Sequence, residues 1–381
     1  MKIGIMGTRG IPNHYGGFEQ TAQYLSAGLV NRGHEVFVYS PHDHPYPHKK
    51  WNGVNIVHCY DPEKKLGTAG QFIYDWNCIN DARKRNFDIL LHLGYSSDSI
   101  WFWRWPKRAI NIMNMDGLEW KRSKYGKLTK YFLKKAEWLA AKNSDLLIAD
   151  STRIQQHIMN HYGKHSTFIP YGADLFEDID VTVLKNFDLY PHQYYLLIAR
   201  MEPENNIEMV IKGYLATKKR EPLVVVGSVS NKYGQYLLKH YTNPNVIFSG
   251  AVYEPHLINN LRYFSLCYFH GHSVGGTNPS LLEAMACGCN IAAHRNVFNK
   301  AVLQKEGDYF SSEYEIADLI NFPVDTEIAA ERKQVNFEKI RSTYNWENII
   351  EKYELLMLGA MYPKEKPILE VSLTASESAT G

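Results

Sequence analysis

Short apolar segments alternate with helical segments along most of this chain. The first three form a strand over residues 2–7, a helix over 18–32 and a second strand over 35–40. Because a strand–helix–strand connection of this length joins parallel strands, the alternation predicts a parallel sheet covered by helices. This pattern limits the chain to the α/β class more firmly than any single motif does.

The alternation divides the chain into two series. It lapses over the polar stretch 175–192 and resumes with a strand that starts at Tyr194. A chain of 381 residues has room for two domains with separate cores. We therefore predict two Rossmann-like domains over 1–174 and 193–341, a linker over 175–192, a last helix over 342–360 and a disordered tail over 361–381.

Composition narrows the class of protein. The net charge of +2, with 45% hydrophobic and 22% charged residues, is typical of a soluble globular protein and argues against a dedicated nucleic-acid binder. The first residues read as a strand instead of a signal peptide, and no apolar run approaches the length that spans a bilayer. Five scattered cysteines favour reduced thiols in a cytoplasmic protein.

The segment HGHSVGGTNPSLLEAMACGCN, residues 270–290, carries the clearest sign of chemistry. A buried strand over 266–269 leads into a turn with Gly275 and Gly276, and Asn278 and Pro279 are a typical cap and first residue of a helix. Free backbone amides at the positive end of a helix suit a phosphate or diphosphate. The alternative is a capped helix after a tight turn.

A second glycine loop, TRGIPNHYGGFEQ at residues 8–20, also precedes a helix. It is neither a GxGxxG dinucleotide fingerprint nor a P-loop, which disfavours a nicotinamide dehydrogenase. Gly16, Gly17 and Glu19 would lie at the carboxyl end of the first strand, where open α/β sheets bind ligands. These glycines could instead serve only to make a tight turn.

The 270–290 segment resembles the donor-site signature of retaining GT-B glycosyltransferases of glycosyltransferase family 4. Its sequence HSVGGTNPSLLEAM is most similar to that of a bacterial subgroup that transfers rhamnose during surface-polysaccharide synthesis. The resemblance implies a GT-B fold in which the last helix, YNWENIIEKYELL, crosses back onto the first domain with Trp346 as its anchor. It places the donor diphosphate on the amides around Gly275, Gly276 and Thr277, and the ribose on Glu283.

The family's other donor contacts are matched only in part. Arg200, in the segment IARMEPENN, corresponds to an arginine that neutralises the leaving diphosphate, but the family's lysine is replaced by Asn205. The family's second glutamate, eight positions before Glu283, is replaced by Gly275. These departures leave open an altered donor such as a deoxysugar and an inactive nucleotide-sugar or glycan-binding paralogue. A nucleotide-sugar epimerase on the same fold is a further hypothesis.

The segment NMDGLEWKRSKYGK supplies the acceptor side of the predicted site. Asp116 is the first candidate to orient or deprotonate the attacking hydroxyl and Glu119 the second, and the alternative is an Asp-Gly turn with an N-capping role. The resemblance implies retention of configuration without a protein nucleophile or a metal. The predicted donor-binding residues are Gly16, Gly17, Arg200, Ala251, Val252, His272, Gly275, Gly276, Thr277, Asn278 and Glu283.

The expected partners follow from this site. We expect a uridine- or thymidine-diphosphate sugar as donor, a glycan or lipid-linked acceptor and no cofactor. The aromatic, basic segment 101–109 and the bases at positions 121–135 suggest contact with anionic lipid at the inner face of the plasma membrane, or else an ordinary solvated face. His42, His44 and His48 could bind zinc, but a solvated loop fits them better.

Overall fold

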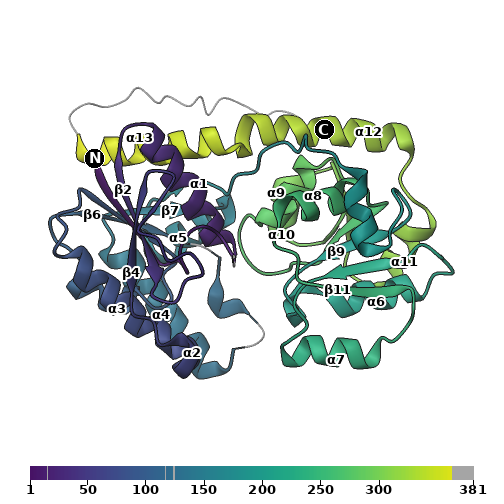
Figure 1. Ribbon diagram of the computed structural model, residues 1–381, viewed down its shortest axis with the longest axis horizontal. Helices are drawn as coiled ribbons and strands as arrows, with labels where there is room; N and C mark the ends of the chain where they lie inside the picture. The colour runs from purple at the N-terminus through teal and green to yellow at the C-terminus, as the bar shows by residue number, and fades with distance from the viewer. Residues whose placement is uncertain (15, 116, 123–124, 363–381) are drawn as a thin grey trace.

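The computed structural model describes residues 1–14, 16–115, 117–122 and 125–362 of the chain. Two α/β domains lie side by side, and a long helical segment at the end of the chain runs along one edge of both (Figure 1). The predicted pair of parallel-sheet domains is thereby confirmed. The predicted disordered tail and the candidate Asp116 lie outside the described residues, apart from positions 361 and 362.

The described part of the first domain contains an eight-stranded sheet in the order β3-β4-β2-β1-β5-β6-β7-β8, parallel except for the edge strand β3. Its central strands are buried on both faces, as continuous apolar runs predict for a parallel sheet. The strands are β1 Lys2–Met6, β2 Glu35–Pro41, β3 Lys50–Trp51, β4 Val54–Cys59, β5 Ile89–Leu93, β6 Ile110–Asn114, β7 Leu146–Ala149 and β8 Thr167–Phe168. The helices are α1 Gly17–Asn31, α2 Glu63–Leu66, η1 Gly67–Ala69, α3 Gly70–Ala82, η2 Ser99–Arg104, η3 Glu119–Lys121, α4 Lys127–Asn143 and α5 Thr152–Tyr162.

The described part of the second domain contains a parallel six-stranded sheet in the order β11-β10-β9-β12-β13-β14. Its strands are β9 Tyr195–Ile198, β10 Leu223–Val226, β11 Val246–Gly250, β12 Cys267–His270, β13 Ile291–His294 and β14 Asp308–Phe310. Its helices are η4 Val181–Phe187, η5 Pro203–Asn205, α6 Ile207–Leu215, α7 Lys232–His240, α8 Pro255–Tyr263, α9 Pro279–Ala286, α10 Val297–Leu303, α11 Glu313–Asn321 and α12 Thr326–Lys339.

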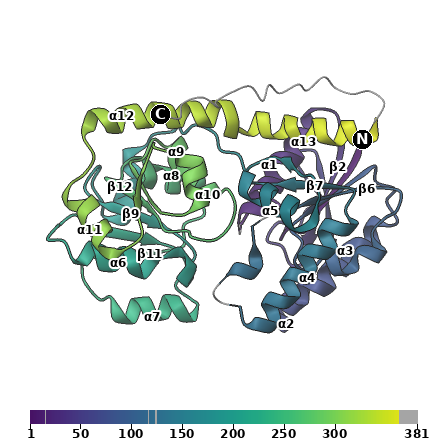
Figure 2. The same cartoon turned by 180° about the vertical axis from the view of Figure 1, so that it is seen from behind.

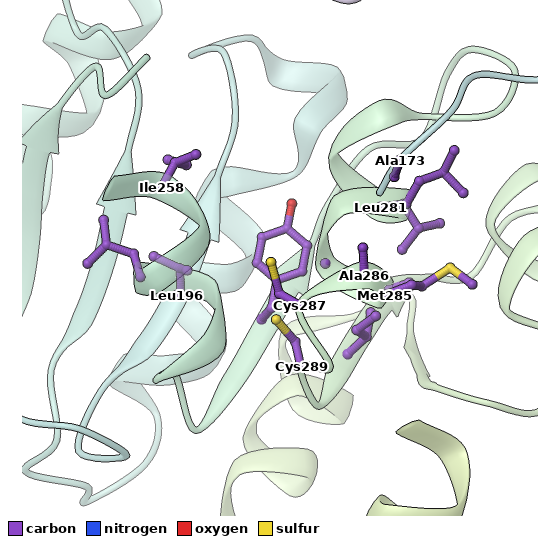
Figure 3. Packing of buried hydrophobic residues seen from close by; sticks show 14 of the residues in the cluster. Ala173, Leu196, Ile258, Leu281, Met285, Ala286, Cys287 and Cys289 are labelled. Atoms are coloured by element: carbon purple, nitrogen blue, oxygen red, sulfur yellow. The ribbon is translucent and has the colours of Figure 1, made fainter. Parts of the chain in front are cut away.

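The stretch 175–192, predicted as a linker, packs onto the second domain. It contains η4, and Leu184 and Leu189 are buried in the core of that domain. Figure 3 shows that even Ala173 lies near the core side chains of α9, among them Leu281. The chain therefore passes between the domains over only a few residues near Ala173. The sequence predicted a longer linker because the polar composition of 175–192 concealed its two buried leucines.

The chain crosses back to the first domain through one helical segment. Helix α12 passes through a π-helical turn, η6 Ile340–Tyr344, into α13 Trp346–Met361, and the yellow-green ribbon in Figures 1 and 2 spans both domains. Trp346 is buried against Gly172 and stacks on Tyr24 of α1, with ring centroids 4.5 Å apart. The expected anchor of the last helix is therefore in place. The two crossings touch, since the amide of Ala173 donates to the carbonyl of Tyr344 at 2.7 Å.

Candidate functional site

The glycine turn between β12 and α9 has the predicted local geometry. The side chain of Asn278 caps α9 by accepting a hydrogen bond from the amide of Ser280 at 2.9 Å, and Pro279 is the first helical residue. Gly275 has φ of +130°, a conformation that side-chain-bearing residues rarely adopt. The turn follows the carboxyl end of a parallel strand, so the amides that open α9 face the edge of the sheet where α/β domains bind ligands.

The first domain covers this turn. A Cβ added to Gly117 would lie 2.7 Å from the Cα of Gly275, and one added to Gly276 would lie 2.0 Å from both carboxylate oxygens of Asp150. The hydroxyl of Thr277 donates to the backbone carbonyl of Asp150 at 2.6 Å. The two domains are therefore in close contact at the predicted diphosphate position, and a ligand of that size needs them to separate before it can enter.

A second helix start lies beside the first. Gly16 precedes α1 in an extended conformation, and a Cβ on Gly17 would lie 3.2 Å from the Cγ of Pro279 on α9. Glu19, buried in the first turn of α1, accepts a hydrogen bond from the amide of Arg9 at 2.7 Å and so holds the preceding loop. Two helix N-termini from different domains thus converge, and the positive ends of both dipoles favour a shared anion. The predicted residues Gly16 and Gly17 lie next to the donor turn.

Glu283 of α9 is held from both sides. Its Oε2 pairs with Arg262 of α8 at 2.5 Å, and its Oε1 accepts from Nε2 of Gln20 in the first domain at 2.9 Å. Arg262 is only 2% exposed and also donates to the hydroxyl of Ser280 at 2.9 Å. Sequence reasoning identified Glu283 but missed Arg262, because an arginine near the end of an amphipathic helix carries no local sign of burial.

Arg200 follows β9 with an exposed side chain. The loop around it is fixed by Asn205, whose side-chain amide donates to the Arg200 carbonyl at 2.7 Å. Burial, followed by the positive charges of Arg200 and Arg122, lowers the pKa of His272 to about 3. The charge of Arg200 is therefore felt at His272, in the segment that leads into the donor turn. His272 stacks on His270 at 4.5 Å, and its Nδ1 is buried without a hydrogen-bond partner among the described residues.

Glu119 lies in a line of ion pairs that crosses the cleft. Its Oε1 accepts from Nη2 of Arg122 at 2.6 Å, and Nη1 of Arg122 lies 3.7 Å from Oε1 of Glu204 in the second domain. The loop that contains Gly117 and Glu119 is also held by the first domain, because the buried Tyr95 hydroxyl donates to the carbonyl of Gly117 at 3.3 Å. The structure therefore gives Glu119 a role at the domain interface. Asp116 immediately precedes Gly117 but lies outside the described residues.

The remaining predicted donor residues, Ala251 and Val252, follow β11, whose last residue Gly250 adopts φ of +80°. Ala251 is exposed, and Val252 is partly buried against the core of the second domain. Within the described residues no group of three histidine, cysteine or acidic side chains could hold a metal ion. No described helix has the length and hydropathy needed to cross a bilayer.

Comparisons with known proteins agree with this architecture. Residues 1–174 match a family described as a domain of unknown function, DUF1972, and residues 190–330 match the family described as glycosyl transferases group 1. A search of curated proteins found no match.

Solved structures resemble the chain over about 95% of its length at low sequence identity. Sucrose-phosphate synthase from Thermosynechococcus elongatus is 15% identical with a TM-score of 0.78, and the alignment covers 95% of this chain and 99% of that one. HepE from Anabaena, solved with UDP-glucose, is 13% identical with a TM-score of 0.72, covering 94% and 99%. The α,α-trehalose 6-phosphate synthase from Burkholderia multivorans is 8% identical with a TM-score of 0.72, covering 95% and 97%.

Proposed function

We propose that this chain, which has the GT-B fold and a second domain matching the group 1 glycosyl transferases, moves a sugar from a nucleoside-diphosphate donor to a hydroxyl acceptor. The observation that carries the proposal is the convergence of two helix starts on one glycine turn, with Glu283 one turn along α9. Such an arrangement offers backbone amides and two dipole ends to a diphosphate and a carboxylate to the hydroxyls of the nucleoside sugar.

The donor would lie across the second domain. The amides at Gly275, Gly276 and Thr277 would hold the diphosphate together with Arg200, and Glu283 would accept from the ribose hydroxyls. The base would rest on Ala251 and Val252. Fixed positive groups at the leaving diphosphate stabilise its developing charge and take the place of a metal ion. HepE is a structural neighbour solved with a uridine nucleotide-sugar, which supports a donor of this chemical class.

The reaction would proceed with retention of configuration. The acceptor oxygen attacks C1 of the sugar on the face from which the diphosphate departs, the C1–O bond to phosphate breaks, and the acceptor proton passes to a diphosphate oxygen. Asp116 and Glu119 would guide the acceptor hydroxyl from the first domain. Closure of the domains would exclude water that hydrolyses the donor. This scheme requires positioning and charge stabilisation instead of a protein nucleophile.

The two departures from the donor motif have structural reasons, which favours an altered donor over a decayed site. Gly275 occupies a backbone conformation in which a glutamate would be strained, and Asn205 holds the carbonyl of Arg200. The small cavity beside the turn is lined by Val274 and Phe298 but mostly by polar residues, among them His272, Asn278 and Asn296. Rhamnose, which the sequence resemblance implies, is the proposed sugar and a surface glycan the proposed product.

A thermal-shift screen across nucleotide-sugars tests the proposal, because a ligand that binds only the folded chain raises its melting temperature. We expect thymidine- or uridine-linked sugars to give the largest shift, and Glu283→Gln to abolish it. Glu351→Gln, on the exposed face of α13, is the matched control. Release of nucleoside diphosphate only when acceptor is present would establish transfer. Binding without release would indicate a binding paralogue, and donor conversion without acceptor would indicate an epimerase.

We also propose that α4 rests on an anionic membrane surface that carries a lipid-linked acceptor. The helix exposes Leu128 and Tyr131, at 87% and 64%, on the same face as Lys135, Trp138 and Lys142. The lysines lie over the aromatic rings, and the single acidic residue of the helix, Glu137, is buried. Exposed apolar and basic side chains in one stripe suit the interface of a bilayer with negative headgroups.

Flotation with vesicles of phosphatidylglycerol and phosphatidylcholine tests this surface. We expect Lys135→Glu with Lys142→Glu to reduce binding to the anionic vesicles. Lys232→Glu with Lys239→Glu on α7 makes the same charge change on the other domain and should leave binding unaltered. Equal losses in both double variants would show a general charge effect and reject α4 as the contact.

A further inference from the structure

Arg262 is the largest fully buried side chain of the described residues, and nothing in the reaction scheme uses it. It belongs to α8, whereas the proposed donor site is built from α9 and the strand ends. A buried guanidinium costs several kcal/mol unless its charge and hydrogen bonds are satisfied. Its environment therefore indicates what the residue does.

The guanidinium is organised around Glu283. Nη2 donates to Oε2 of Glu283 and to the hydroxyl of Ser280, and Nη1 donates to Oδ1 of Asn259 at 2.7 Å. Burial opposes the charged form of Arg262, but the Glu283 carboxylate leaves its pKa raised above the ordinary value. Three partners on two helices fix the guanidinium, and the guanidinium in turn fixes one oxygen of Glu283.

The other carboxylate oxygen of Glu283 is held less permanently. Its partner Gln20 belongs to the first domain, so this hydrogen bond lasts only while the domains are in contact. The carboxylate remains partly accessible, with 24% of its side chain exposed. When the domains separate, the ion pair with Arg262 remains and keeps Glu283 in one orientation, with Oε1, the atom that Gln20 contacts, directed to the first domain.

We propose that Arg262 is a positioning residue that orients Glu283 to accept hydrogen bonds from the ribose hydroxyls of the donor nucleotide. The inference rests on the proposed function and adds a residue on which ribose recognition depends. A glutamate has three side-chain torsions. If the carboxylate is not anchored, their conformational entropy is lost each time the donor binds, and this loss weakens binding. Arg262 removes that loss before the donor arrives, which is the usual benefit of preorganisation.

Calorimetric titration with UDP and with 2′,3′-dideoxy-UDP measures this role directly. Hydrogen bonds from hydroxyls to a charged carboxylate should make the wild-type chain prefer UDP by about tenfold to a hundredfold. In Arg262→Met we expect the preference to fall below about threefold, through weaker binding of UDP and nearly unchanged binding of the dideoxy analogue. Arg262→Lys keeps the charge without the planar fork and should give an intermediate preference.

Asn259→Ala serves as a milder variant in case Arg262→Met does not fold. It removes one contact to the guanidinium and leaves the ion pair intact, so we expect a partial loss of the UDP preference. Glu351→Gln should retain the full preference. An undiminished preference in Arg262→Met or in Asn259→Ala would overturn the proposal, as would a wild-type chain that binds both nucleotides equally. Failure of the wild-type chain to bind any nucleoside diphosphate would instead contradict the proposed function.

Discussion

Replacing Gly276 by alanine tests the contact between the donor turn and the first domain. The new Cβ would lie 2.0 Å from both carboxylate oxygens of Asp150, whereas ordinary contacts begin at 3.4 Å. Asp150 is 1% exposed, and its backbone carbonyl is tied to Thr277, so the carboxylate has little space into which it can move. Inserting one methyl group into a packed site of this kind costs about 1–3 kcal/mol.

The steric clash can also be relieved in a second way, by separation of the two domains. Separation would break the Thr277–Asp150 and Gln20–Glu283 hydrogen bonds, each worth about 1 kcal/mol. We therefore expect Gly276→Ala to lower the melting temperature, by roughly 2–4 °C per kcal/mol, and to shift the chain to a more open form with a larger radius of gyration. Differential scanning calorimetry and small-angle X-ray scattering measure the two effects.

Two further variants make the test specific. Asp150→Ala in the Gly276→Ala background removes the clashing oxygens, and we expect it to recover at least about 1 kcal/mol relative to additive losses. Gly126→Ala is the control, since its Cβ would meet no atom of the described residues within 4 Å, and its expected cost is only that of a weaker N-cap on α4. The reasoning is refuted if Gly276→Ala behaves like Gly126→Ala, or if its loss is additive with that of Asp150→Ala.

Three other predictions concern His272, Trp346 and Gln20. His272 has a folded-state pKa of about 3, below its ordinary 6.5, so the unfolded chain binds the extra proton and this residue makes stability fall as pH drops from about 6.5 towards 3. The melting temperature of His272→Gln should therefore decline less than that of the wild-type chain between pH 7 and 4.5, and parallel curves would contradict this. Trp346→Ala should cost about 3–5 kcal/mol in urea unfolding, against little for the half-exposed Trp103→Ala; equal losses would remove Trp346 as the anchor. Gln20→Ala should strengthen UDP binding a few-fold by freeing Oε1 of Glu283, and weaker binding in a titration would show that Gln20 contacts the nucleotide itself.

Local signals explain what the sequence could predict. Asn278 accepts a hydrogen bond from an amide two residues away and Pro279 fixes the first helical residue, and the strand–helix alternation is a property of short windows. For this reason the two parallel sheets, the cap of α9, the glycine turn and the last helix could all be predicted from sequence. Family resemblance added Glu283, Arg200 and Trp346, which the structure places at the cleft or at the crossing between the domains.

Contacts between distant segments explain what the sequence could not predict. Asp150 meets Gly276 across the domain interface, and Arg262 meets Glu283 from a neighbouring helix 21 positions earlier. Neither partner has a periodic or motif signal of its own. The boundary of the second domain was obscured for a related reason: Leu184 and Leu189 are isolated leucines in a polar stretch, and only their burial shows that 175–192 belongs to that domain.

The joined crossings at Ala173 and Tyr344 limit how the two halves of the molecule can move. The two connections between the domains, near Ala173 and near Tyr344, lie side by side and are joined by a hydrogen bond. The α12–α13 segment runs along the same edge of both domains. Sliding would shear both connections, whereas rotation about that point disturbs few contacts. The two domains should therefore open by a hinge rotation. The displacement should be smallest beside Trp346 and largest at the far edge, where Figures 1 and 2 show α2 and α7.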